Sequence, residues 1–196
     1  MMRRILLVAI LLLCSAAVVH AQAFSIYATS SSGRFSNVQT GSVLTTSGFQ
    51  NRYTDFWASG IGGGVTFNLI PVGPVRIGLD FRGSTRPGTT GADTAMAGVK
   101  VGFHPPVIPI KPYIQASGGY VATRTVNVST GAPLNSTFNN QYAAWEILGG
   151  VDFPLAPFLD LRVIELGGGA GTSAFGSSNS PNISLFTVNS GLVLHF

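Results

Sequence analysis

The sequence predicts an all-β protein, an eight-stranded antiparallel up-and-down transmembrane β-barrel preceded by a cleavable signal peptide. Many short segments alternate apolar residues with polar or small ones, which is the two-residue period of a strand. The composition is 45% hydrophobic and only 9% charged. Yet no segment after residue 23 offers the roughly 20 consecutive apolar residues that a membrane helix needs. Strands with one apolar face and one polar face favour a barrel with lipid outside and a polar lumen.

Residues 1–23 have the features of a secretory signal peptide. Arg3 and Arg4 precede an apolar run, and small residues at its end place cleavage after Ala21 or Ala23. The apolar run is shorter than a membrane crossing requires. We therefore expect this segment to be removed on export.

The barrel domain is expected to span residues 24–196 without a disulfide. Cys14, the single cysteine of the sequence, lies in the predicted leader. Without Arg3 and Arg4, nine Lys and Arg (11 − 2) face seven Asp and Glu, a net charge of +2. No basic patch is interleaved with aromatic residues, so no nucleic-acid partner is expected.

Eight segments show strand alternation, and loops or proline turns separate them. The expected strands are 24–29, 55–70, 75–84, 94–103, 111–125, 142–153, a seventh beginning at 158, and 186–196. Long polar loops are expected at 30–52, 126–140 and 171–181, with a shorter one at 86–93. Short proline turns are expected at 71–74, 104–109 and 154–157.

The third strand shows the sidedness most clearly. Val75, Ile77, Leu79 and Phe81 alternate with Arg76, Gly78, Asp80 and Arg82. Because charges avoid lipid, the charged row must face the lumen. The same reasoning over all strands predicts a lumen polar network of Arg76, Asp80, Arg82, Lys100, Glu146, Asp152, Asp160 and Arg162. An eight-stranded barrel is only wide enough for side chains, so paired charges that fill the interior are favoured over an ion path.

The seventh strand departs from simple alternation. Strict alternation after Val163 would point Glu165 at lipid. A β-bulge near Ile164 would return Glu165 to the lumen.

Four strands end on the same pattern, an apolar residue followed by any residue and then Phe. A recurring aromatic residue at one strand depth is typical of an interfacial girdle. The predicted girdle has Phe67, Phe103, Phe153 and Phe196 at one membrane surface and Trp57, Tyr120 and Trp145 nearer the other.

The last strand carries a spaced set of residues, Asn189, Gly191, Leu194 and Phe196. This spacing resembles the C-terminal assembly signal of bacterial outer-membrane β-barrels. The resemblance implies that the barrel-assembly machinery reads this strand during insertion, through edge pairing.

Over its length after the leader, the chain resembles the small eight-stranded outer-membrane barrels, the OmpA-like and OmpX-like transmembrane domains. The resemblance implies an integral protein of the bacterial outer membrane, monomeric and in contact with outer-membrane lipid. Short turns and termini would lie in the periplasm and long loops outside the cell. The loops at 30–52 and 126–140 would then contact an extracellular ligand whose identity the sequence does not reveal.

The sequence favours a non-enzymatic structural or surface-interaction role. His104 and His195 are the histidines outside the leader, and neither stands in the His-x-Ser arrangement of lipid-deacylating barrels. We therefore expect no catalytic residue. No cluster has metal-ligand spacing and no glycine-rich run fits a phosphate loop, so no metal or cofactor is expected. Two alternatives are a minor channel for small solutes and, less favoured, an outer-leaflet lipid-modifying enzyme.

Overall fold

The computed structural model describes residues 24–105, 107–126, 137–173 and 182–196, without the side chains of 42, 44, 49, 137 and 138. Its strands are β1 (Phe24–Thr45), β2 (Gly48–Val72), β3 (Val75–Arg86), β4 (Gly91–Phe103), β5 (Lys111–Val126), β6 (Thr137–Ala156), β7 (Leu159–Ser173) and β8 (Ile183–His195). The predicted signal peptide and its cleavage site lie outside the described residues.

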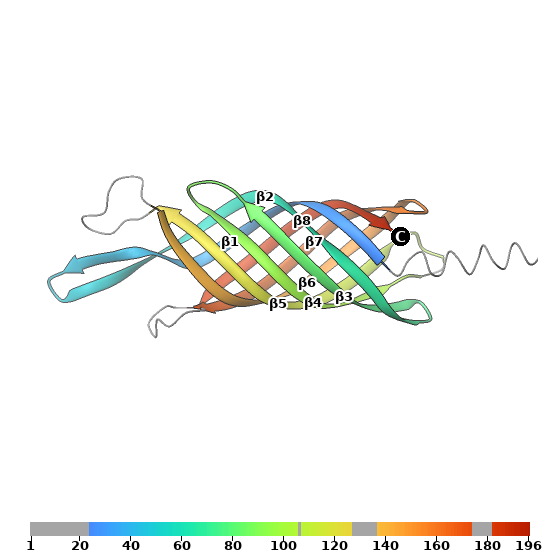
Figure 1. Ribbon diagram of the computed structural model, residues 1–196, viewed down its shortest axis with the longest axis horizontal. Coiled ribbons are helices and arrows are strands. Elements are labelled where there is room, and N and C mark those ends of the chain that lie inside the picture. Colours follow the sequence, from blue (N-terminus) through green and yellow to red (C-terminus); the bar gives the residue numbers. More distant parts are fainter. Residues whose placement is uncertain (1–23, 106, 127–136, 174–181) are drawn as a thin grey trace, which may run out of the picture.

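The strands form one closed ring. Each strand pairs antiparallel with the next in sequence, and β8 pairs with β1 to close the barrel (Figure 1). The predicted eight-stranded up-and-down fold is therefore confirmed. Within the described part of the chain, no helix is long and apolar enough to cross a membrane.

The two faces of the strands differ as the alternation predicts. In β3, Asp80 is fully buried, whereas the neighbouring Phe81 is 50% exposed. On β2, Trp57 and Ile61 are 58% and 69% exposed. The outer wall is therefore apolar, and the wall that faces the lumen carries most of the polar side chains.

The expected loop at 30–52 is wrong, because β1 and β2 run through it. These strands are 22 and 25 residues long and are joined by a turn at Thr46 and Ser47. The hairpin projects beyond the rest of the barrel, at the end opposite the C-terminus (Figure 1). Both of its faces carry small or polar residues, so the segment shows no hydrophobic alternation although its backbone is extended.

Other strand ends also lie beyond the expected limits. β6 begins at Thr137 and continues to Ala156, so the expected turn at 154–157 is reduced to Pro157 and Phe158. Arg86 belongs to β3 and Gly91 to β4, which shortens the loop between them. Most of the expected loops at 126–140 and 171–181 lies outside the described residues.

The predicted bulge in β7 is confirmed. The pairing of β7 with β8 shifts between Arg162 and Glu165. Val163 and Ile164 both face outward, and Glu165 is 1% exposed. The extra residue returns Glu165 to the lumen.

The lumen contains two kinds of filling. Towards the hairpin end it holds an apolar cluster, which includes Phe35, Val38, Val121, Tyr142 and Ile183, all buried. Towards the other end it is polar. The sequence analysis expected a polar lumen throughout, so the apolar cluster is a finding of the structure.

Glycines make room for two tyrosines in the polar part. A Cβ atom added to Gly64 would lie 2.4 Å from the Tyr27 hydroxyl, and one added to Gly150 would lie 2.5 Å from the Tyr113 hydroxyl. Each tyrosine ring can therefore lie across the lumen.

Candidate functional site

The charged lumen is the first candidate site. Seven of the eight side chains expected there are largely enclosed: Asp80, Arg82, Lys100, Glu146, Asp152, Asp160 and Arg162. The eighth, Arg76, is partly exposed and lines a small cavity near the short-turn end. Except for Arg76, all of these residues have a hydrogen-bond or ion-pair partner inside the barrel.

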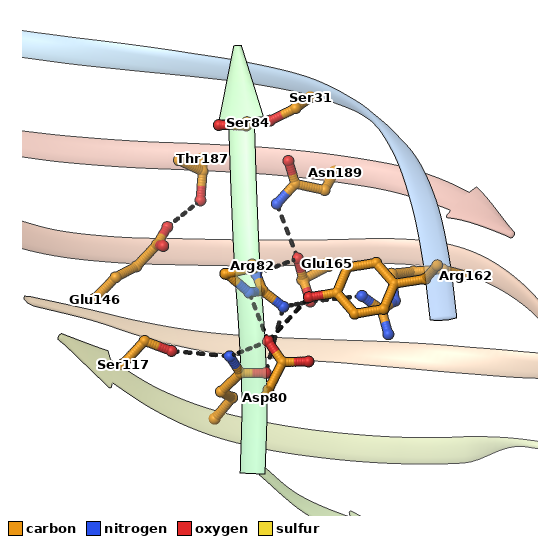
Figure 2. Close-up of polar contacts among 12 residues, drawn as sticks. Ser31, Asp80, Arg82, Ser84, Ser117, Glu146, Arg162, Glu165, Thr187 and Asn189 are labelled. Carbon is orange, nitrogen blue, oxygen red and sulfur yellow. Dashed lines mark hydrogen bonds and ion pairs between the residues drawn. The ribbon is translucent and has the colours of Figure 1, made fainter. Parts of the chain in front are cut away.

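Glu165 lies at the centre of the network (Figure 2). Its carboxylate accepts hydrogen bonds from Arg82 at 2.9 and 3.0 Å and from Arg162 at 3.2 Å. The Tyr113 hydroxyl donates at 2.5 Å and the Asn189 amide at 2.9 Å. Five hydrogen bonds to one carboxylate satisfy a buried charge that would otherwise be costly.

Asp80 is the second acceptor of Arg82. The Arg82 Nε atom lies 3.0 Å from its Oδ1 atom. Thr66 donates to Asp80 at 2.7 Å, Gln115 at 2.8 Å and Tyr27 at 2.9 Å. Arg82 thus joins two carboxylates from different strands.

Two further carboxylates lie towards the short-turn end. Asp152 accepts from Arg162 Nε at 3.0 Å and lies 3.6 Å from Lys100 Nζ. Asp160 lies 2.7 Å from both Lys111 Nζ and His195 Nε2. His195 is therefore a polar lumen residue.

Glu146 and Arg86 lie towards the hairpin end. Glu146 accepts a hydrogen bond from the Thr187 hydroxyl (Figure 2). Arg86 is 2% exposed, donates to Ser31 at 2.7 Å and Ser84 at 2.9 Å, and lies 5.4 Å from the centre of the Phe35 ring. It links the polar network to the apolar cluster.

His104 lies in the turn after β4, beside the polar end of the lumen. Burial, and after it the nearby cations Arg76, Lys111 and Lys100, together lower the pKa of its imidazole to about 4. The ring is therefore neutral at physiological pH.

The described lumen contains small cavities. One of about 30 Å³ lies near Arg82 and Glu146, and another of about 30 Å³ lies near Lys100 and His104. Each has room for a few water molecules, because one water molecule needs roughly 10–15 Å³ of such cavity volume. The described residues also include no group of three His, Cys, Asp or Glu side chains that could hold a metal ion.

Most residues of the expected aromatic girdle lie on the outer wall. Phe67, Phe103, Phe153 and Phe196 are exposed, as are Trp57 and Trp145, whereas Tyr120 is half-buried. Phe67 and Phe196 each contact Phe24, with ring centres 5.3 and 5.9 Å apart. Their place at a membrane surface stays a prediction.

The residues of the expected assembly signal hold the closing seam together. Asn189 points into the lumen towards Glu165, and Leu194 pairs with Ile26 of β1. Phe196 and Phe24 exchange backbone hydrogen bonds of 2.8 and 3.4 Å. Recognition of this strand by the assembly machinery is not tested by these contacts.

The network also contains residues that the sequence analysis did not place there: Tyr27, Arg86, Lys111 and Tyr113. Glu165 joins them through the predicted bulge. Arg86 shares the even-numbered phase of Arg76, Asp80 and Arg82, so extending that strand by two residues would have found it. Tyr113 shares the phase of Gln115, but nothing in the sequence indicates that its hydroxyl reaches Glu165.

No family model matches the chain, and no curated protein matches it in sequence. Solved structures do match. The alignment with the crystal structure of Neisserial surface protein A (NspA) covers 89% of this chain and 97% of the NspA chain, with 14% sequence identity and a TM-score of 0.50. The fold is that of the small eight-stranded outer-membrane β-barrels.

Two further structures of this type align over similar lengths. The N-terminal barrel domain of OprF from Pseudomonas aeruginosa shows 12% identity over 89% of this chain and 98% of its own, with a TM-score of 0.48. Ail, the attachment invasion locus protein of Yersinia pestis, shows 9% identity over 88% of this chain and 99% of its own, with a TM-score of 0.44. At these identities the likeness concerns the outer-membrane barrel fold alone.

Proposed function

We propose that the chain is an integral, non-enzymatic protein of the bacterial outer membrane that binds an extended polypeptide at its β1–β2 hairpin. The unpaired outer edge of this hairpin carries the proposal. The first β2 residue paired with β3 is Ile61, and the last β1 residue paired with β8 is Ser36. Among the described residues, 48–60 of β2 and 37–45 of β1 therefore have a strand neighbour on one side only.

The β2 edge is the better docking edge of the two. On β1, the Gln39 carbonyl accepts hydrogen bonds from Asn140 at 2.6 Å and Thr125 at 3.5 Å. The Asn37 side chain donates to the Asn182 carbonyl at 3.0 Å. These contacts cover part of β1. A partner strand added to β2 would gain main-chain hydrogen bonds along 50–60.

The outer wall and the lumen support this proposal in different ways. An exposed apolar wall around a closed barrel favours insertion into lipid. A lumen filled by paired charges and an apolar cluster favours a structural barrel over a conducting one. The activity would then lie on the projecting hairpin.

The placement of the hairpin outside the cell can be tested with single cysteines. Ser47 lies at the hairpin tip, and Val107, which is 88% exposed, lies in the turn at the other end. A membrane-impermeant maleimide should label Ser47→Cys in intact cells and Val107→Cys only after lysis. The opposite pattern would refute the proposed orientation.

The edge can be tested with two proline variants. Backbone amides alternate between the two sides of a strand, so one of Gln50 and Asn51 directs its amide towards the free edge. Proline there should leave the barrel folded and abolish binding of extended peptides selected on the wild-type barrel. Undiminished binding to both folded variants would contradict strand addition.

A further inference from the structure

A hollow of about 440 Å³ lies at the base of the projecting hairpin. Thr40 of β1 and Arg52 and Phe56 of β2 line one side, and Thr90, before β4, and Thr125 of β5 line the other. Its volume lies in the range of small-molecule sites, roughly 300–1,000 Å³. It is separate from the two small cavities of the lumen.

The lining combines apolar ring faces with hydroxyl groups. The Phe56 ring stacks on the buried Phe35 ring with centres 5.4 Å apart, so its position is fixed by the apolar cluster below. Tyr53 adds a second, 40% exposed ring. The half-buried Thr90 supplies a hydroxyl group that can both donate and accept hydrogen bonds. Thr40 and Thr125 are buried, and their hydroxyls donate to the backbone carbonyls of Arg52 and Gln39. A sugar ring presents the matching combination, apolar C–H faces edged by hydroxyl groups.

Arg52 supplies a charge that no carboxylate of the described residues pairs with. All seven carboxylates of the sequence lie in the described part of the chain, and none of them forms an ion pair with Arg52 there. The aspartates at this end form ion pairs with other arginines: Asp55 with Arg34 at 3.0 Å and Asp93 with Arg124 at 2.9 Å. No acidic residue lines the hollow.

We propose that this hollow binds a sugar unit that carries a carboxylate. The aromatic rings pack against its C–H face, the Thr90 hydroxyl bonds one of its hydroxyl groups, and the Arg52 guanidinium pairs with its carboxylate. Arginine binds a carboxylate through two parallel N–H donors, which also fixes the orientation of the ring. The inference rests on the proposed function for one point, the extracellular position of this end.

The test is a titration of the refolded full-length barrel in detergent with two probes. Methyl β-D-glucuronide and methyl β-D-glucoside differ only at C6, which is a carboxylate in the first and a hydroxymethyl group in the second. The glucuronide should bind at least tenfold more tightly, and Arg52→Gln should remove most of this difference, because charged hydrogen bonds contribute on that scale. Equal binding of the two probes, or no saturable binding, would overturn the proposal.

Two control variants separate the site from its surroundings. Arg34→Gln removes the same charge from the same hairpin but does not touch the hollow, so glucuronide binding should be unchanged. Thr90→Val keeps the side-chain shape and removes one hydroxyl, so both probes should bind several-fold more weakly. If Arg34→Gln weakened glucuronide binding as much as Arg52→Gln, the loss would reflect the lower positive charge of the hairpin and not a contact in the hollow. That outcome would refute the site.

Acidic sugars occur both in bacterial lipopolysaccharide and in external polysaccharides. A third titration with the eight-carbon keto acid of the lipopolysaccharide core identifies the source: tighter binding than the glucuronide indicates the cell's own lipid, and weaker binding an external glycan. These titrations do not involve the backbone edge of β2. Loss of sugar binding and failure of peptide capture are therefore independent results.

Discussion

At the scale of single residues, Glu165 holds the lumen together. It accepts hydrogen bonds from two arginines, a tyrosine and an asparagine, which come from β3, β5, β7 and β8. A buried charge with this many partners is costly to remove, because its partners are then left unpaired in a site without bulk water.

We expect Glu165→Ala to lower the free energy of unfolding by about 3–5 kcal/mol, since Arg82 and Arg162 lose their shared carboxylate. Urea titration of the barrel in lipid vesicles, followed by the gel shift between folded and unfolded forms, measures the change. Asp55→Asn is the control, because it breaks an exposed ion pair with Arg34 and should have little effect. Equal midpoints for Glu165→Ala and the wild type would contradict the central role of Glu165.

His104 predicts a pH effect of definite sign. Its pKa is about 4 in the folded barrel and near 6.5 when unfolded, so the unfolded chain binds more protons between these values. This contribution to stability is full above pH 6.5 and is lost as the pH falls towards 4. His104→Gln should therefore lose less stability than the wild type between pH 7 and pH 4.5 in the same unfolding assay. An equal loss would refute the assignment.

Much of the residue-scale picture could be predicted from the sequence, because sidedness follows from period two. Asp80, Arg82 and Arg162 could be placed in the lumen, and the conflict at Glu165 required the bulge. Partner choice could not be predicted. Which cation reaches Glu165 depends on the stagger between strands far apart in sequence, and alternation excludes odd shifts of register but does not choose among even ones.

At the scale of elements, the seam between β8 and β1 decides whether the barrel closes. Phe196 and Phe24 exchange the last backbone hydrogen bonds of this seam. Gly191 lies within it, where an added Cβ atom would be 2.0 Å from the Ala28 carbonyl oxygen. A backbone atom at that distance cannot move aside cheaply, so the glycine is required by packing.

We expect Gly191→Ala, and Phe196→Ala or deletion of Phe196, to reduce the yield of folded barrel in the membrane fraction. The alanine at 191 forces the two strands apart, and loss of Phe196 weakens the last pairing. Heat-modifiable mobility on gels reports the folded fraction. Ser184→Ala, on the same strand with an exposed side chain, is the matched control. Wild-type yields for the seam variants would refute this prediction.

The hairpin shows why sequence patterns fail for some elements. In the membrane, lipid imposes contrast between the faces of a strand. The projecting hairpin lacks this contrast, and the serine, glycine and asparagine found there are also typical of loops. The extended backbone is set by pairing, from Val38↔Thr54 to Thr45↔Gly48, which composition does not encode.

At the scale of the whole molecule, the charges nearly cancel. The described residues carry nine Lys and Arg and seven Asp and Glu, a net of +2 (9 − 7). Among these residues, three cations have no carboxylate contact: Arg52 at the hairpin end, Arg76 at the other end, and the buried Arg86, whose hydrogen-bond partners are the hydroxyls of Ser31 and Ser84. The near balance of charge in the rest of the interior follows from the cost of unpaired charge in a narrow lumen.

We expect the purified barrel to show no stepwise conductance in planar bilayers. The apolar cluster and the network around Glu165 fill much of the lumen, and the cavities beside them, of about 30 Å³ each, are small for a hydrated ion. An open porin recorded in the same bilayers is the positive control. Ohmic steps that respond to charge reversal at Arg82 or Glu146 would instead favour the channel alternative.

The bulge at Val163 and Ile164 has a consequence for how the length of β7 can change. Inserting or deleting one residue between the bulge and Ser173 would exchange the lumen-facing and outward-facing side chains of the adjoining part of the strand, whereas a change of two residues would preserve both faces. Natural variation in strand length should therefore come in steps of two residues. A step of one residue should occur only where a second β-bulge returns the side chains to their original faces.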